Sequence, residues 1–111
     1  MSAELSERDF ESAADRTLHA LDGALTDQDD FDVELTMGIL TIELGDGAKY
    51  VVNSHRAARQ IWMAAERTAW HFDLEPETGR WIASKTGDEL WSTIGRVLGE
   101  KLGRPLQLVH P

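Results

Sequence analysis

Apolar and polar residues alternate in short runs through the middle of the chain, and this pattern limits the fold more than any other sequence feature. The runs cover residues 31–35, 39–44, 49–53, 60–64, 70–74 and 80–84. A period of two sends successive side chains to opposite faces of a strand. Short connections such as Met37-Gly38 and Gly45-Asp46-Gly47 make neighbouring strands antiparallel. The sequence therefore predicts five or six strands that bury one face.

A segment with a helical period precedes these strands. Apolar residues between Phe10 and Leu25 recur at spacings of three and four, which gives a helix one buried stripe. Ser6 is suited to cap the first turn, because its hydroxyl can accept a hydrogen bond from an unpaired backbone N–H. The sequence predicts an amphipathic helix that begins after Ser6.

A second helical pattern follows the strands, from Leu90 to Leu102. We predict that Thr86–Glu89 forms a capping box and that Gly103-Arg104-Pro105 ends this helix. The apolar tail, residues 106–109, is expected to pack against the domain. In the order α-β-α along the chain, these elements predict an α+β sandwich. Its two helices pack on one face of an antiparallel β-sheet and leave the other face open to water.

Composition narrows the class of protein. With 111 residues, of which 41% are hydrophobic, the chain has room for one modest core, so we expect a single domain over residues 1–111. It contains no cysteine, which excludes disulfides, thiolate zinc sites and cysteine-held iron–sulfur clusters. No segment has the pattern of a signal peptide or a membrane span. We therefore expect a cytoplasmic protein.

The net charge of −9 is unevenly distributed. Residues 1–46 contain 13 acidic residues and two arginines, whereas residues 47–111 contain seven acidic residues and nine lysines or arginines. An acidic half of this strength repels nucleic acids and anionic membranes, and it attracts cations or a basic protein surface. A purely solubilising role for the acidic residues is the alternative.

The acidic residues suggest where a cation would bind. In the first helix, Glu11, Asp15 and Asp22 fall within about 40° of one another beside the apolar stripe, at 100° per residue. Others follow in the connection to the first strand and in that strand. Carboxylates are ligands for hard cations such as iron, calcium or manganese, and this spacing does not match an EF-hand. The candidate ligands are Glu11, Asp15, Asp22, Asp27, Asp29, Asp30 and Asp32.

Alternation also separates the tryptophans by face. Trp62 shares its face with Gln60 and Ala64, whereas Trp70 alternates with the inward set and Trp91 lies on the stripe of the second helix. A large aromatic among outward residues suggests partner binding. His71 also points outward, as a surface histidine, an auxiliary metal ligand or a partner contact. No nucleophile elbow, phosphate loop or HxxxH pair indicates an enzyme.

Several of these runs resemble the frataxin family of the bacterial CyaY type. The resemblance extends from about Phe10 to Leu102, and the Asn-x6-Gln-x-Trp spacing of Asn53, Gln60 and Trp62 is its most specific part. The matching runs are Tyr50-Val51-Val52-Asn53, Gln60-Ile61-Trp62, His71-Phe72-Asp73-Leu74 and Trp81-Ile82.

The resemblance implies a role in iron–sulfur cluster assembly. It implies weak binding of iron, as Fe2+ or Fe3+, by acidic residues of the first helix and first strand. The partners would be the cysteine desulfurase and the iron–sulfur scaffold protein. The desulfurase would be contacted by the acidic edge, which is the name we give to the seven candidate ligands together. The partner-binding residues would be Asn53, Gln60, Trp62 and His71. The chain departs from the family pattern late in the first helix, where Asp22-Gly23 and Thr26 replace paired acids, so individual iron ligands stay open.

Two other functions compete with this hypothesis. A ferroxidase or iron-storage protein would use the same carboxylates, but it would need a buried dinuclear site. A general acidic binding module would have no metal role. We expect a monomer, with an iron-induced oligomer as the alternative.

Overall fold

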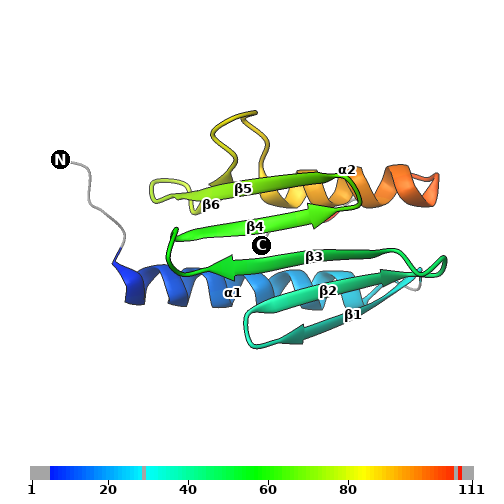
Figure 1. The fold of residues 1–111 in the computed structure, drawn as a ribbon, viewed down its shortest axis with the longest axis horizontal. Coiled ribbons are helices and arrows are strands. Elements are labelled where there is room, and N and C mark those ends of the chain that lie inside the picture. Colours follow the sequence, from blue (N-terminus) through cyan, green and yellow to red (C-terminus); the bar gives the residue numbers. More distant parts are fainter. Residues whose placement is uncertain (1–5, 29, 107, 109–111) are drawn as a thin grey trace.

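The computed structural model describes residues 6–28, 30–106 and 108. The elements are α1 (Glu7–Thr26), β1 (Phe31–Thr36), β2 (Ile39–Leu44), β3 (Lys49–His55), β4 (Gln60–Ala65), β5 (Thr68–Glu75), β6 (Arg80–Ile82) and α2 (Leu90–Leu102). The strands form one antiparallel sheet in the order β1-β2-β3-β4-β5-β6. Both helices lie behind the sheet in Figure 1. The predicted α+β architecture is confirmed.

The first helix begins where the sequence predicts. Ser6 is its N-cap, and the Ser6 hydroxyl accepts a hydrogen bond of 3.0 Å from the backbone N–H of Asp9. The buried stripe of α1 packs against β1, β2 and β3. Its members are Phe10, Ala14, Leu18, Leu21 and Leu25. No helix in the described part of the chain is long and apolar enough to cross a membrane.

The second helix covers the predicted residues, Leu90–Leu102, but the expected capping box at Thr86–Glu89 is wrong. Glu89 is the N-cap, and its carboxylate accepts hydrogen bonds from the backbone N–H groups of Trp91 and Ser92. Thr86 instead donates its hydroxyl to Asp88 within the preceding loop. A charged carboxylate can accept hydrogen bonds from two N–H groups at once. Its negative charge also interacts favourably with the positive end of the helix dipole. Gly103 ends α2 in a left-handed conformation, as predicted.

Trp81 on β6 joins the sheet to α1. Its side chain is only 1% exposed, and its ring meets Phe10 edge to face, with 5.9 Å between ring centroids. The indole N–H donates to the hydroxyl of Thr17 at 3.0 Å. Trp70 was also expected in the core. It belongs to the inward set but is only half-buried, because β6 pairs with β5 no further than Asp73.

The residues after α2 fold back along the helix. Leu106 and Leu108 pack against the core, as predicted for the apolar tail, while Gln107 and Val109 lie outside the described residues. Two glycines make the close approach possible. A Cβ at Gly95 would lie 3.0 Å from the carbonyl oxygen of Leu106, and one at Gly99 would lie 3.0 Å from that of Arg104.

Lys101, in the last turn of α2, links two turns of the sheet. Its ammonium lies 2.9 Å from a carboxylate oxygen of Asp46 and 2.7 Å from one of Glu66. The hydrogen bond to Glu66, followed by the one to Asp46, raises the pKa of Lys101. The backbone N–H of Ala48, and then Lys101, lower the pKa of Asp46, while burial raises the pKa of Tyr50 nearby.

Replacement of Lys101 by methionine is expected to give a pH-dependent loss of stability. A raised lysine pKa stabilises the fold fully below the ordinary value of 10.5, and this contribution is lost as pH rises through the folded-state value. A lowered aspartate pKa stabilises the fold above the ordinary value of 3.8 and loses effect as pH falls through the folded-state value. The difference in unfolding free energy between the wild type and the variant should therefore be largest from about pH 5 to 9.

Urea unfolding at pH 3, 7 and 11 would measure this gap, which should also shrink in high salt because the groups lie at the surface. Lys49→Met is the matched control, since Lys49 has no ion pair among the described residues. A gap that is equal at all three pH values would mean that the methylene chain of Lys101, and not its charge, stabilises the fold.

Candidate functional site

The four predicted partner-binding residues share the sheet face that the helices leave uncovered. Asn53 on β3 lies opposite Trp62 on β4, and Trp62 lies opposite His71 on β5. Gln60 lies two residues from Trp62 and therefore projects from the same face. The strand register thus brings Asn53, Gln60, Trp62 and His71 together as one surface, which we call the docking face.

Trp62 lies between two imidazoles. The His55 ring stacks on one side, with 3.7 Å between centroids, and the His71 ring stacks on the other at 4.2 Å. Both pairs are within 14° of parallel. This stacking explains why Trp62 is half-buried although it lies on the outward face. The indole is held flat against its neighbours, so its orientation is fixed before any partner binds.

A chain of hydrogen bonds that starts at the indole N–H also restrains the Trp62 side chain. The indole N–H of Trp62 donates to the side-chain oxygen of Gln60 at 2.8 Å. The Gln60 amide nitrogen donates to the Asp73 carboxylate at 3.0 Å. Asn53 donates to the backbone carbonyl of Ser54 at 3.3 Å. Gln60 therefore positions Trp62, which spacing alone could not reveal.

Sequence reasoning did not include His55 and Asp73 among the partner-binding residues. The register that places His55 opposite Gln60 and Gln60 opposite Asp73 is the signal that identifies them. Alternation along β3 puts His55 on the face of Asn53, but only the pairing of β3 with β4 shows that it reaches Trp62.

The predicted metal ligands within the described residues are spread over α1, the loop after it and the start of β1, and they do not form a single cluster. Asp30 and Asp32, together with Glu43 from β2, line a hollow of about 390 Å³ at one end of the sheet. Asp22 accepts a hydrogen bond from the Thr26 hydroxyl, and Asp27 is the C-cap of α1. Asp29 lies outside the described residues.

Glu11 and Asp15 lie toward the opposite end of α1. Glu11 forms an ion pair with Arg56 of the β3–β4 turn, and Glu7 lies 3.5 Å from the same guanidinium. Asp15 is 3.4 Å from the imidazole of His19. Asp30 is paired with Arg104. Among the described residues, no three acidic or histidine side chains are close enough together to hold a metal ion.

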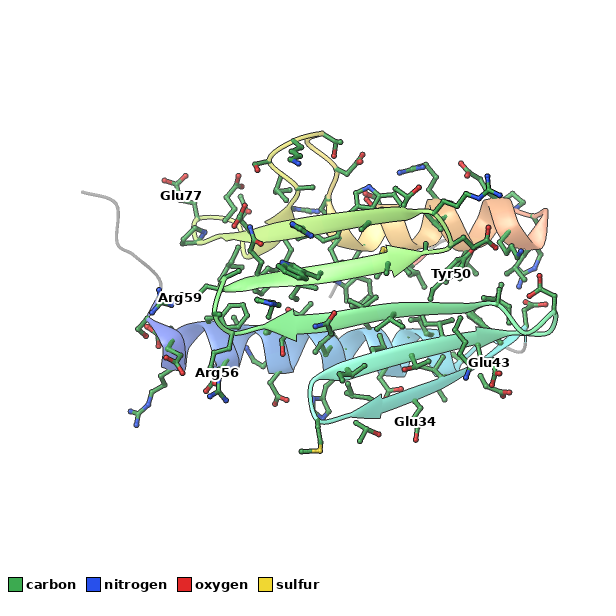
Figure 2. The ribbon with its side chains drawn as sticks, in the orientation of Figure 1. Glu34, Glu43, Tyr50, Arg56, Arg59 and Glu77 are labelled. Carbon is green, nitrogen blue, oxygen red and sulfur yellow. The ribbon has the colours of Figure 1, made fainter. Side chains whose placement is uncertain are left out.

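Acidic and basic side chains gather at different ends of the sheet. Figure 2 shows Glu34 of β1 and Glu43 of β2 at the lower right, and Arg56 and Arg59 of the β3–β4 turn at the left. A partner that crosses the open face would therefore meet carboxylates at one end and the guanidinium of Arg59 at the other, where Arg56 is already paired with Glu7 and Glu11 of α1. Such a pattern favours one orientation of the partner and speeds its association.

Comparison with known proteins finds one family over most of the chain. The family model described as a frataxin-like domain matches residues 3–104. The iron-sulfur cluster assembly protein CyaY of Pseudomonas entomophila is 32% identical over 103 residues, which cover 92% of this chain and 94% of the relative.

Two solved structures share the fold. Frataxin from Psychromonas ingrahamii superposes with a TM-score of 0.86 at 20% identity, over 95% of this chain and 99% of that chain. Trimeric frataxin from the yeast Saccharomyces cerevisiae, complexed with ferrous iron, gives a TM-score of 0.64 at 24% identity, over 94% of this chain and 92% of that chain.

Proposed function

This chain belongs to the frataxin-like family, and we propose that it is a cytoplasmic, single-domain iron-binding protein of iron–sulfur cluster assembly. In this proposal it binds the complex of cysteine desulfurase and scaffold protein as a monomer and regulates cluster formation. The observation that carries the proposal is the docking face, where Asn53, Gln60, Trp62 and His71 form one surface that neither α1 nor α2 covers. The Pseudomonas relative is named an iron-sulfur cluster assembly protein, which supports the same pathway.

The docking face is suited to a protein partner. Trp62 offers a large, pre-oriented aromatic surface, and aromatic residues contribute much of the binding free energy at protein interfaces. Because His55, His71 and Gln60 already restrain the ring, little side-chain entropy is lost on binding. The chain has no cysteine, so any cluster must be built on another protein.

The acidic edge, which comprises the seven predicted ligands, is proposed to bind iron weakly. Asp30, Asp32 and Glu43 line one open hollow, where they would supply negative charge and individual oxygen ligands to a largely hydrated hard cation, because no three of the described acidic side chains converge on one point. Asp30 would have to exchange Arg104 for the metal, which lowers the affinity further. In the family hypothesis iron is cargo or a signal and not a catalytic cofactor. No described feature favours a ferroxidase centre.

Anaerobic titration with Fe2+ tests the iron proposal. Backbone NMR signals from Asp22 to Asp32 and near Glu43 should broaden first. Asp32→Asn should weaken binding by about fivefold, because it removes one charge about 4 Å from the ion. Glu77→Gln is the matched control. It removes one charge from an exposed residue of the β5–β6 turn, away from the edge, and should leave the affinity unchanged. Equal effects of the two variants would mean that iron responds only to net charge.

A further inference from the structure

The side of β5 away from β4 is only partly paired. Strand β6 covers Asp73, Leu74 and Glu75, and residues 68–72 extend beyond it. No other strand in the described part of the chain pairs with this segment. In an antiparallel ladder, alternate residues direct their N–H and C=O groups to the same neighbour. The free segment therefore presents backbone groups in the pattern that an incoming strand would use.

The loop after β6 stands beside this edge without closing it. Its backbone bonds are internal: the N–H of Ala83 donates to Asp88 at 2.8 Å, and the N–H of Gly87 donates to Ala83 at 2.7 Å. The Thr86 hydroxyl donates to the Asp88 carboxylate at 2.8 Å. Because the loop satisfies its own groups, it forms a stable second wall and leaves the β5 edge available.

Between the two walls lies a pocket of about 270 Å³. Thr68, Trp70 and His71 line it from β5, and Ser84, Lys85 and Thr86 line it from the loop. Pockets for cofactors and drug-sized ligands usually occupy about 300–1,000 Å³. This pocket is smaller, so it suits a side chain of a bound peptide segment better than a cofactor. Trp70 lines this pocket, which agrees with its incomplete burial.

The charge of the pocket is opposite to that of the whole chain. None of the described residues that line it is acidic, although the net charge of the protein is −9. Lys85 forms no ion pair with any described residue. Two carboxylates from the elements that flank the pocket are engaged elsewhere, Asp73 of β5 by Gln60 and Asp88 of the loop by Thr86. The pocket thus offers an ammonium, hydroxyl groups and an imidazole to an anionic group.

We propose that an extended segment of a partner protein adds to the free edge of β5 and places an acidic side chain on Lys85. Backbone hydrogen bonds to the edge give affinity, and the pocket selects the carboxylate. The site borders the docking face through His71 and Gln60, but it is separate from the acidic edge and needs no iron. It can therefore succeed or fail independently of the proposed function.

A blocked peptide, acetyl-Thr-Val-Glu-Val-Thr-amide, is the probe, and the same peptide with Gln in place of Glu is its control. Titration of the full-length protein, followed by backbone NMR, should shift signals on both walls, residues 68–71 and 84–86. Amide exchange in residues 68–72 should slow. The Gln peptide should bind about three- to fivefold more weakly, the loss expected for one exposed ion pair.

Lys85→Ala should remove the preference for the Glu peptide, whereas Lys49→Ala, which deletes the same charge on β3, should preserve it. Lys85 is exposed, and urea unfolding would verify that its variant is folded. Sodium acetate provides a third arm. If acetate alone reproduces the shifts on both walls, the site binds small anions and strand addition is wrong. Equal affinity for the two peptides, or shifts at the β1 edge instead, would also overturn the proposal.

Discussion

Trp81→Ala is expected to be among the most destabilising single substitutions in this protein, with a loss of about 3–5 kcal/mol. Small domains have only about 5–15 kcal/mol of unfolding free energy, so the variant should be partly unfolded at moderate temperature. The reason is position: Trp81 is 1% exposed and contacts both Phe10 and Thr17 of α1. Its removal leaves a cavity between α1 and β6 that neither element can close without moving.

Urea unfolding monitored by circular dichroism would measure this loss. Trp81→Phe retains most of the packing and lacks the indole N–H, and Thr17→Val removes the acceptor of the same hydrogen bond. A double-mutant cycle on these two changes separates hydrogen bonding from packing. Trp70→Ala is the comparison of equal size, and it should cost far less because Trp70 is half-buried. A similar loss for Trp70→Ala and Trp81→Ala would contradict the assignment.

Trp62→Ala should weaken binding to the complex of desulfurase and scaffold by about 30-fold or more, which corresponds to at least 2 kcal/mol at an interface anchor. Its effect on the unfolding free energy should be about 1–3 kcal/mol, since two stacked aromatic pairs of about 0.5–1.5 kcal/mol each are lost. The substitution should therefore reduce partner affinity more than it reduces the stability of the fold. Isothermal titration and urea unfolding on the same samples would compare the two.

Trp62→Phe is the conservative variant, because it keeps a ring between His55 and His71 but cannot donate to Gln60. It should restore most of the stability and only part of the affinity. If Trp62→Ala unfolds as readily as Trp81→Ala while the folded fraction binds normally, Trp62 only covers the sheet, and the docking face would have to be abandoned.

Alternation located the strands and their faces because burial of one face requires a period of two. It placed Trp62 outward and Trp70 inward, and the register confirms both directions. Alternation could not show how much of each strand is paired with a neighbouring strand. Trp70 and Trp81 both belong to inward sets, yet only Trp81 is fully buried, since the short β6 leaves part of β5 without a neighbour.

The sites were predictable to different degrees. The four docking residues follow from alternation and the family spacing. The contribution of His55 depends on the register between two strands, which a single sequence does not contain. Among the predicted iron ligands, Glu11 and Asp30 are paired with Arg56 and Arg104. These pairs join residues distant in sequence, so a count of carboxylates along the chain could not reveal them.

The neighbour-to-neighbour strand order has a kinetic consequence. Each strand pairs only with strands adjacent in sequence, so every hairpin can close with a short loop and a small entropic cost. The contact between Thr17 and Trp81 spans 64 residues and joins the two ends of the fold. It should therefore form after the folding transition state. Loss of Trp81 would then appear mainly as faster unfolding, with the refolding rate nearly unchanged in stopped-flow measurements, and a large drop in the refolding rate would mean that α1 docks early.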